Sequence, residues 1–432
     1  MALQNVVIIG GGWAGYTLSR SLDDKRFQIT VISPEPTSPY TPLLASAACG
    51  LFSFSLVGCW YRFTSYISVL TPLVQAEDSI RHKRRAVRLI QARVRDIDFE
   101  KKICSCNPAF PKLADQIFDV SYDSLIIAPG CETNTFNTPG VSENALFVRT
   151  VADAMAVRQR LLDILEMASL PNMTEVQQRN LLHIIVVGGG PTGVEITAEM
   201  YDLVHNDLIY LYPDLAGKIS VAIHDVAAQI LSVFDAKLAE YALSSFTHHD
   251  VEIKTASHIT KVDNDTVYTK EDGAIKYGLL IWATGNRQVP LVDSLKLTKS
   301  ARLPRIQTDY YLHPLRLDGT PISDVYAVGD AADITGGELP TTAEVACQKG
   351  EYVAKVLNTG RSDPFVYQQK MLVAYTGQHD GVIAGRKDWT GGAAWVAWRS
   401  KNLTWARSWR NKILIVTTWM LNYTFGKEIA RA

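Results

Sequence analysis

Cysteine is scarce in this chain. Its 432 residues include six cysteines, and no two of them have CxxC or CxxxxC spacing. Neither a metal site nor a redox-active disulfide pair is therefore expected. Few cysteines in a long chain also fit a reducing, intracellular compartment.

An excess of either charge is missing as well. The chain has 43 Lys and Arg against 44 Asp and Glu, which gives a formal net charge of −1. This balance argues against nucleic acid as a partner. We interpret the local basic run from Ile80 to Asp96 as a solvated helix and strand face.

Long apolar stretches are absent too. No segment reaches the roughly 18 apolar residues of a membrane-spanning helix. The first apolar run, Val6 to Ile9, ends in a glycine cluster, whereas a signal peptide would end in a small-residue cleavage site. We therefore expect a β-strand there and no targeting segment in this chain.

Two similar glycine-rich segments are what the sequence does contain. VVIIGGGWAGYTLSRSL begins at Val6, and HIIVVGGGPTGVEITAEM begins at His183. Each segment reads as an apolar strand, a G-x-G-x-x-G turn and the start of a helix. The glycines with this spacing are Gly10, Gly12 and Gly15 in the first segment and Gly188, Gly190 and Gly193 in the second.

The spacing of these glycines favours dinucleotide binding. The first glycine allows a tight turn, the second lets the backbone approach a pyrophosphate, and the third lets the helix pack on the strand. The pyrophosphate then lies at the helix N-terminus, where N–H groups and the helix dipole attract anions. The sequence predicts two nucleotide sites, with a merely structural turn as the alternative for each.

Residues about 20 positions beyond each turn are candidates for binding the ribose hydroxyls. The strand FQITVIS ends at Ser33, with Glu35 just beyond, and the sequence does not choose between them. The strand KISVAIHD ends at Asp225, whose carboxylate would accept from a 2′-hydroxyl and repel a 2′-phosphate. NADH is therefore favoured over NADPH, unless Asp225 only ends a strand.

Three more strands end in similar signals. YDSLIIAPG closes on Ala128 and Gly130, YGLLIWATG closes on Gly285, and DVYAVGDAAD ends in Gly329–Asp330. This order of motifs resembles the two-dinucleotide-binding-domain flavoproteins. The resemblance implies FAD at the first glycine turn, NAD(P)H at the second, and contact of Asp330 with the ribityl chain and diphosphate of FAD.

Within that superfamily the chain resembles the type II NADH dehydrogenases, the single-chain NADH:quinone oxidoreductases. The segments that carry the resemblance are TPLLASAACG, GGGPTGVEITAEMYDL, YGLLIWATGNR, TTAEVACQKGEYVAK and the tail from Trp395, so it covers essentially the whole chain. It implies an enzyme that passes hydride from NADH to FAD and then two electrons to a quinone, without pumping protons.

The expected fold class is α/β, with two Rossmann-like dinucleotide-binding domains. We expect an FAD-binding domain from residues 1–148 and 290–368, with an NADH-binding domain inserted at 149–289. The first helix of the insert is expected at VADAMAVRQRLLDILEMA, from its apolar periodicity. Residues 369–432 form a C-terminal amphipathic helical module.

The family resemblance also implies roles for single residues. Thr41 and Pro42 would lie beside the isoalloxazine, and the backbone of Val94 would meet the FAD adenine. Glu195 would lie near the meeting point of nicotinamide and flavin. The segment Ala343 to Gly350, which includes Glu344, Ala346 and Gln348, would approach the flavin and the acceptor. The catalytic candidates are Glu195, Glu344 and Gln348.

Two departures from the family pattern concern the acceptor. Glu344 replaces the first Gln of A-Q-V-A-x-Q, and His379 and Asp380 stand where apolar residues are usual. A carboxylic acid near the flavin could relay protons to a quinone if burial raises its pKa. We assign this role to Glu344, with His379 as a helper; drift on the rim of the pocket is the alternative.

The tail combines basic and aromatic residues. From Arg399 onward it has seven basic residues and one acidic residue. Spacings of three, four and seven, typical of one helix face, relate Trp398, Trp405, Trp409, Ile413, Val416, Met420 and Tyr423. We interpret this pattern as a helix lying on a membrane surface. The alternative is packing on the protein's own core or on a second subunit of a homodimer.

Three functions remain open at this stage. The first is NADH:quinone oxidoreduction at a membrane surface. The second keeps FAD and NADH but acts on a non-quinone small molecule, in which case Glu344 and the GQHDG stretch belong to a different pocket. The third is a redox-sensing flavoprotein similar to apoptosis-inducing factor.

Overall fold

The computed structural model describes residues 3–52, 58–60, 87–231, 236–248, 251–301, 303–370, 372–384, 388–406 and 409–427. The chain forms two compact units. Unit 1 comprises Met1–Ser38, Cys59–Glu132 and Asn286–Gln369, and unit 2 comprises Pro39–Gly58, Thr133–Gly285 and Lys370–Ala432. The functional division expected from the sequence, into FAD domain, NADH domain and tail module, stays a prediction.

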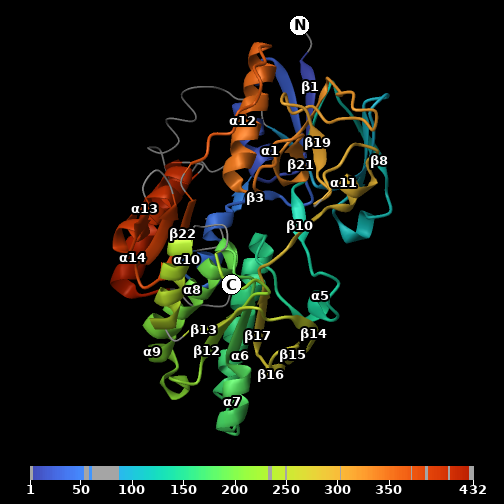
Figure 1. Ribbon diagram of the computed structural model, residues 1–432. Coiled ribbons are helices and arrows are strands. Elements are labelled where there is room, and N and C mark those ends of the chain that lie inside the picture. Colours follow the sequence, from blue (N-terminus) through green and yellow to red (C-terminus); the bar gives the residue numbers. More distant parts are fainter. Residues whose placement is uncertain are drawn as a thin grey trace. The chain divides into compact units, whose positions relative to one another are not determined.

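A parallel sheet forms the centre of unit 1, with the strand order β20–β9–β1–β2–β5 (Figure 1). Its strands are β1 (Gln4–Ile9), β2 (Phe27–Ile32), β5 (Arg88–Ile90), β9 (Ser124–Ile127) and β20 (Val325–Ala327). Val6 to Ile9 are buried on both sides of the sheet, which is typical of parallel strands covered on both faces. The predicted parallel α/β arrangement is confirmed here.

Different elements cover the two faces of this sheet. Helices α1 (Trp13–Ser21) and α12 (Ala343–Thr359) pack against each other, and their Leu18 and Val353 share a core with Val6 and Ile8. On the other face, Val7 packs with the antiparallel strands β6 (Ala92–Asp98), β7 (Ile103–Pro108) and β8 (Phe118–Ser121). Unit 1 also contains η2 (Pro111–Leu113), α11 (Pro290–Ser294), β19 (Ile306–Thr308), η5 (Gly329–Ala331) and β21 (Ala332–Ile334).

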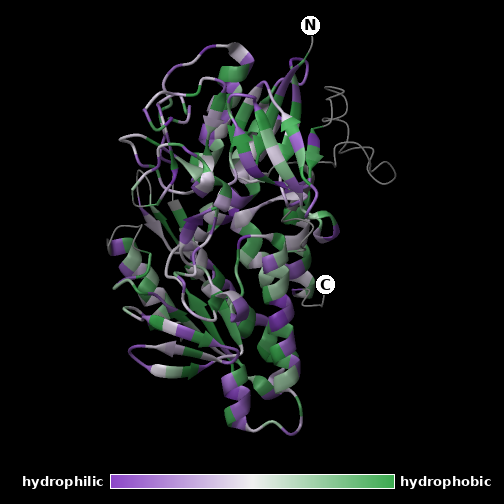
Figure 2. Cartoon of the chain, turned by 90° about the vertical axis from the view of Figure 1, so that its right-hand side faces the viewer, coloured by the Kyte–Doolittle hydropathy of each residue, from purple (hydrophilic) through white to green (hydrophobic). Residues whose placement is uncertain are grey.

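Unit 2 repeats the parallel architecture, with the strand order β13–β12–β11–β17. Its strands are β11 (His183–Val187), β12 (Ser220–His224), β13 (Glu252–Lys254) and β17 (Leu279–Trp282). Figure 2 shows hydrophobic colours along the inner strands of the fold. Helix α6 (Val151–Ala168) has the bounds that its periodicity predicts, because Thr150 and Asp153 form a capping box at its start.

Helix α8 (Pro191–Leu203) follows β11 and continues into one π-helical turn, η3 (Val204–Leu208). The further elements of unit 2 before the tail are η1 (Thr41–Leu43), α2 (Leu44–Ala48), α5 (Val141–Asn144), α7 (Glu175–Leu181), α9 (Ile209–Leu211), η4 (Pro213–Leu215), α10 (Ala236–His248), β14 (Ile259–Asp263), β15 (Thr266–Thr269) and β16 (Gly273–Lys276). The short strands β3 (Thr37–Pro39), β4 (Gly58–Trp60), β10 (Cys131–Thr133) and β18 (Asn286–Gln288) lie where the chain passes from one unit to the other.

The tail forms a small antiparallel sheet and two helices within unit 2. The strands are β22 (Leu372–Gly377), β23 (Asp380–Ala384) and β24 (Trp389–Thr390), and the helices are α13 (Gly392–Trp405) and α14 (Trp409–Phe425). Ala374 and Val382 share a core with Val194 of α8, so the tail is packed into this unit. Within the described part of the chain, every helix is too short or too polar to serve as a transmembrane span.

The prediction of one continuous tryptophan face in the tail is wrong. Trp398 and Trp405 belong to α13, whereas Trp409 begins α14. Trp398 is only 6% exposed. Its ring stacks on Tyr375 at 4.9 Å, and its N–H donates to Glu195. These interior partners hold Trp398 inside unit 2.

Candidate functional sites

The first glycine turn, between β1 and α1, has the close approaches that its spacing predicts. A Cβ on Gly10, whose φ is +105°, would lie 2.0 Å from the Ala128 carbonyl oxygen, and one on Gly15 would lie 2.1 Å from the Gly10 oxygen. A Cβ on Gly12 would meet no atom within 4 Å. The backbone of Gly12 therefore faces open space, as pyrophosphate binding requires.

The helices that follow the two glycine turns both start without a capping side chain. Helices α1 and α8 begin at Gly12 and Gly190, which offer no side-chain cap, and neither has an acidic residue in its first turn. Helices α6 and α12 are instead capped by the hydroxyls of Thr150 and Thr342. Two helix N-termini thus keep a positive dipole end without a capping side chain, which suits a bound phosphate.

The ribose candidate of unit 1 directly follows β2, and the adenine candidate lies on β6. Ser33 is buried, its carbonyl oxygen accepts from Ala92 N at 3.2 Å, and its hydroxyl accepts from Glu35 N at 3.3 Å. Glu35 is exposed. Val94 is buried and lies on β6, two residues after Ala92. Unit 1 thus places Ser33 beside the start of the strand that carries Val94.

The Gly329–Asp330 motif follows β20 and lies beside the first glycine turn. A Cβ on Gly329, whose φ is +72°, would lie 3.6 Å from the Cβ of Ala14. The Asp330 carboxylate accepts from the Cys131 thiol at 3.4 Å, and its carbonyl oxygen accepts from Gln288 Nε2 at 3.3 Å. The strand ends at Ala128 and Gly130 belong to the same edge, since β9 lies between β1 and β20.

Helix α12 carries the predicted acceptor residues. Gln348 Nε2 donates to Glu344 Oε1 at 2.7 Å and to the Gln368 carbonyl oxygen at 2.9 Å. Gln348 Oε1 also accepts from Gln368 N at 3.0 Å. Ala346, midway between these two residues, points to the core on the other side of the helix. Glu344 and Gln348 are therefore brought together, and both lie half-buried.

The second glycine turn, in unit 2, repeats this geometry. A Cβ on Gly188, whose φ is +120°, would lie 2.9 Å from the Ala283 oxygen, and one on Gly193 would lie 1.8 Å from the Gly188 oxygen. A Cβ on Gly190 would meet nothing within 4 Å. Gly285, after β17, has a φ of +77°, and a Cβ there would lie 2.8 Å from the Asn134 oxygen.

Asp225, directly after β12, is tied to this turn. Its carboxylate accepts from Gly189 N of the turn and from Ala227 N, the second at 2.6 Å. A carboxylate has about four lone-pair sites, so it can still accept from a ribose hydroxyl. The neighbouring His224 is a core residue: its ring bonds Ser257 Oγ at 2.9 Å, and burial lowers its pKa to about 4.

A column of acids runs along α8, in which Glu199 and Asp202 are buried and Glu195 is half-buried. Glu195, Glu199 and Asp202 are spaced four and three residues apart, which places them on one face of the helix. Burial raises the pKa of Glu195 to about 8 and that of Glu199 to about 7. Both carboxyl groups therefore hold a proton through much of the neutral range.

Each acid of the column has a partner from another element of unit 2. Trp398 Nε1 donates to Glu195 Oε1 at 3.3 Å, and Ser46 Oγ donates to Glu199 Oε1 at 2.6 Å. The Tyr375 hydroxyl donates to Asp202 Oδ2. Ser46 lies on α2, directly after the segment that contains Thr41 and Pro42, so unit 2 brings this segment to the column.

Gln378 and His379 form the turn between β22 and β23, and Asp380 begins β23. Gln378 and His379 have positive φ values of 46° and 64°, and His379 is exposed. The Asp380 carboxylate accepts from the Tyr241 hydroxyl at 2.9 Å and from Ser245 Oγ at 3.3 Å, both on α10. This gives Asp380 a structural role, because it anchors the tail hairpin to α10.

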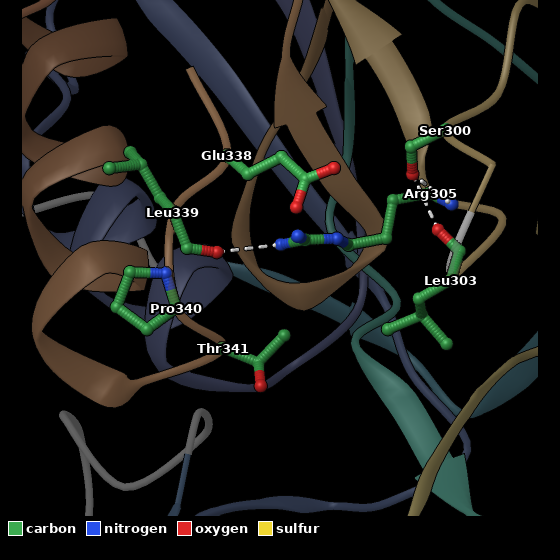
Figure 3. A pocket seen from close by; sticks show the side chains of 7 residues that line it. All are labelled: Ser300, Leu303, Arg305, Glu338, Leu339, Pro340 and Thr341. Atoms are coloured by element: carbon green, nitrogen blue, oxygen red, sulfur yellow. Dashed lines mark hydrogen bonds between the residues drawn. The ribbon is translucent and has the colours of Figure 1, made fainter. Parts of the chain in front are cut away.

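Sequence reasoning missed Glu199, Asp202 and Tyr375. The spacing of the three acids on one helix was the available signal. The pocket in Figure 3, with a volume of about 320 Å³, also lies apart from the predicted residues. Its lining residues, all in unit 1, are Ser300, Leu303, Arg305, Glu338, Leu339, Pro340 and Thr341.

Comparisons with known proteins agree with this two-site architecture. Residues 4–350 match the family model "Pyridine nucleotide-disulphide oxidoreductase". A probable NADH dehydrogenase of Dictyostelium discoideum is 33% identical, over 99% of this chain and 91% of its own. The mitochondrial internal alternative NAD(P)H-ubiquinone oxidoreductase A1 of Solanum tuberosum is 32% identical, over 99% and 88%.

Solved structures show the same fold. NDH2 of Plasmodium falciparum, in complex with NADH, matches with a TM-score of 0.88 and 24% identity, over 99% of this chain and all of that chain. The sulfide:quinone oxidoreductase of Aquifex aeolicus matches with a TM-score of 0.67 and 15% identity. The chain therefore belongs to the pyridine nucleotide-disulphide oxidoreductase family and, within it, to the type II NADH dehydrogenases.

Proposed function

We propose that the chain binds FAD at the glycine turn of unit 1 and NADH at that of unit 2, and passes two electrons from NADH to a quinone. The observation that carries the proposal is the repeated turn, in which each helix starts at an uncapped glycine that faces open space. Family membership supports the assignment of FAD to the first glycine turn and of NADH to the second.

FAD fits the residues of unit 1. Gly12 and the start of α1 would hold its diphosphate, Asp330 its ribityl chain, and Ser33 and Val94 its ribose and adenine. When bound, FAD supplies the redox chemistry, accepting hydride and passing two electrons on. Gly10 and Gly15 keep the backbone tight enough for this approach.

NADH fits the residues of unit 2. Gly190 and the start of α8 would hold its diphosphate, and Asp225 would accept from its ribose hydroxyls. Because Asp225 carries a negative charge beside the turn, it disfavours the 2′-phosphate of NADPH. Asp225 also orders the turn itself, through Gly189 N.

Quinone reduction consumes protons, and unit 2 stores them. The Trp398 N–H can only donate to Glu195 Oε1, so a proton on that carboxyl group would reside on Oε2, whereas the Ser46 hydroxyl can donate to Glu199 or accept from it. Exclusion of water from the column keeps both groups neutral until a base of higher affinity appears. Glu344, held by Gln348, is the proposed donor on the acceptor side.

Helix α14 is the proposed membrane contact. Its exposed apolar residues include Ile413, Met420, Leu421, Tyr423 and Phe425. Exposed apolar and aromatic side chains of this kind can bind at the headgroup boundary of a bilayer. Such a location gives a lipid-soluble quinone access to the enzyme.

Anaerobic stopped-flow spectroscopy tests the function. NADH should bleach the flavin absorbance of the FAD-loaded protein quickly, and a quinone should restore it quickly. If NADH bleaches the flavin quickly but only a non-quinone acceptor restores the absorbance, that acceptor takes the place of the quinone in this proposal. A purified protein that remains colourless in the presence of ample FAD would refute it.

A further inference from the structure

Lys349 on α12 is a lysine with no exposed surface, and the proposed mechanism leaves it unused. Its Nζ donates to the Ala332 carbonyl oxygen at 3.1 Å, directly after the Gly329–Asp330 motif. Lysine is almost never fully buried unless it is paired, because desolvation of an ammonium group is costly. The surroundings of Lys349 must therefore compensate for its burial.

The charged groups that face Lys349 are Asp333, Arg305 and Asp330. Arg305 Nη2 lies 2.5 Å from Asp333 Oδ2, and both side chains are almost completely buried. In the parallel pairing of β19 with β21, Gln307 lies opposite Asp333. Arg305 lies two residues before Gln307 and is therefore close to the start of β21. Lys349, Asp333 and Arg305 form a buried charge cluster, and Asp330 supplies the second negative charge that faces Lys349.

This cluster fixes the segment that joins the Gly329–Asp330 motif to α12. Asp333 Oδ1 accepts from Ile334 N at 3.1 Å and from Leu339 N at 3.0 Å. Arg305 Nη1 donates to the Leu339 carbonyl oxygen at 2.9 Å, as Figure 3 shows. Lys349 adds a third contact to this segment, a hydrogen bond from α12 to the Ala332 carbonyl oxygen.

We propose that Lys349 positions the Gly329–Asp330 loop and supplies the cation that stabilises reduced flavin in unit 1. Hydride uptake by bound FAD would add one negative charge, and a buried cation beside the Gly329–Asp330 loop would favour that charge more strongly than water would. The inference rests on FAD binding by unit 1, as proposed above. Lys349 is a positioning residue, since its hydrogen bond goes to the loop.

The protonation of Lys349 gives the proposal a pH dependence. Burial lowers the pKa of Lys349 to about 8, Asp333 and Asp330 oppose this shift, and Arg305 adds to it. The side chain therefore passes from mostly charged to mostly neutral as the pH rises from 7 to 9. We expect its stabilisation of reduced flavin to be present at pH 7 and lost at pH 9.

Two variants separate the positive charge of Lys349 from its hydrogen bond to Ala332. Lys349→Gln keeps a donor for Ala332 but removes the charge, and Lys349→Met removes both. Lys355→Met, an exposed lysine on the same helix, is the matched control. The measurements, on FAD-loaded protein, are the flavin midpoint potential by dye equilibration and the FAD retained after dilution.

At pH 7 both Lys349 variants should shift the flavin equilibrium about ten-fold toward the oxidised form, a potential about 30 mV lower for a two-electron couple. Lys349→Met should also lose FAD faster, and Lys355→Met should match the unmodified enzyme. An unchanged or higher potential in Lys349→Gln overturns the proposal while leaving FAD binding intact. An unmodified protein that binds no FAD refutes the proposed function instead.

The unmodified enzyme provides a second arm if Lys349→Gln does not fold. Between pH 7 and pH 9 its midpoint potential should fall by about 30 mV more than that of free FAD, a ten-fold change in the equilibrium. A decline parallel to that of free FAD overturns the charge role of Lys349.

Discussion

At the scale of the residue, burial controls the protonation of the acid column. Glu195 and Glu199 have raised pKa values because their environment excludes water. An acid with a raised folded-state pKa stabilises the fold below its unfolded pKa, and this contribution is lost as pH rises toward the folded value. For Glu195 the window runs from about pH 4.5 to about pH 8.

Glu195→Gln should remove this dependence. We expect the free energy of unfolding of the variant, relative to the unmodified protein, to increase between pH 5 and pH 8.5. The increase should reach a few kcal/mol, since each pKa unit is worth about 1.4 kcal/mol. Urea unfolding at the two pH values measures it. Glu240→Gln, at an exposed position of α10, should show no such change; parallel pH profiles for Glu195→Gln and the unmodified protein would contradict the prediction.

Glu344→Gln should separate the two half-reactions. NADH reduction of the flavin needs no proton from Glu344, so its rate should stay within two-fold of the unmodified enzyme. Reoxidation by quinone should slow about 10²-fold or more, the contribution of a general acid. Stopped-flow traces of each half-reaction provide the measurement, and an unaltered reoxidation rate removes Glu344 from proton transfer.

The glycines of the two turns could be predicted from sequence because their conformations depend on local backbone geometry. Gly10 and Gly188 have the positive φ values that the turn requires. The partners of the acid column could not be predicted. Tyr375 reaches Asp202 from 173 residues away along the chain, and apolar periodicity treats Glu199 as a solvent-facing residue.

At the scale of the element, the sequence predicted the parallel strands more accurately than it predicted the structure of the tail. β1 and β11 are runs of buried apolar residues that end in glycine, which leaves little choice of structure. In the tail, aromatic residues at helical spacing carried no information on which ones face the core. Trp398 is buried, while Tyr423 is 94% exposed.

The exposed face of α14 gives a membrane prediction. The double substitution Met420→Glu and Tyr423→Glu should lower binding to anionic vesicles at least ten-fold, because burying each apolar side chain is worth about 1.5 kcal/mol or more. Sedimentation with liposomes measures the binding. Activity with a short-chain, water-soluble quinone should be retained.

Val176→Glu, at an exposed apolar position of α7, is the matched control and should bind vesicles normally. Equal pelleting of the double variant and the unmodified protein would exclude α14 as the contact. Size-exclusion chromatography tests the other use of this face. If the unmodified protein is a dimer and the double variant is a monomer, the exposed face of α14 contacts a second copy of the chain instead of a membrane.

At the scale of the whole molecule, one architecture occurs twice with different tasks. A single substitution can therefore remove one nucleotide and spare the other. A Cβ at Gly12 or Gly190 meets no protein atom within 4 Å, so both alanine variants should fold normally. Each added methyl group would occupy the space where a pyrophosphate approaches.

Gly12→Ala should lower FAD affinity at least ten-fold, whereas Gly190→Ala should retain its yellow colour and raise the KM for NADH at least ten-fold. Flavin absorbance after gel filtration and steady-state kinetics measure the two effects. Gly10→Ala, whose Cβ would lie 2.0 Å from the Ala128 oxygen, should instead lower the melting temperature of the apoprotein. Loss of FAD from Gly190→Ala would reverse the assignment of the nucleotides.

The π-turn η3 gives α8 one surplus residue. In an uninterrupted α-helix, the next position after 195, 199 and 202 on the same face would be 206, eleven residues from the first. The surplus moves that place to Asp207, whose carboxylate pairs with Lys427 at 3.0 Å. Deleting one residue from 204–206 would restore a regular helix and leave Asp207 on the face of the acids. A regular helix that kept every residue would instead turn Asp207 by about 100° away from that face, so the end of the tail is matched to an irregularity in a helix more than 200 residues earlier.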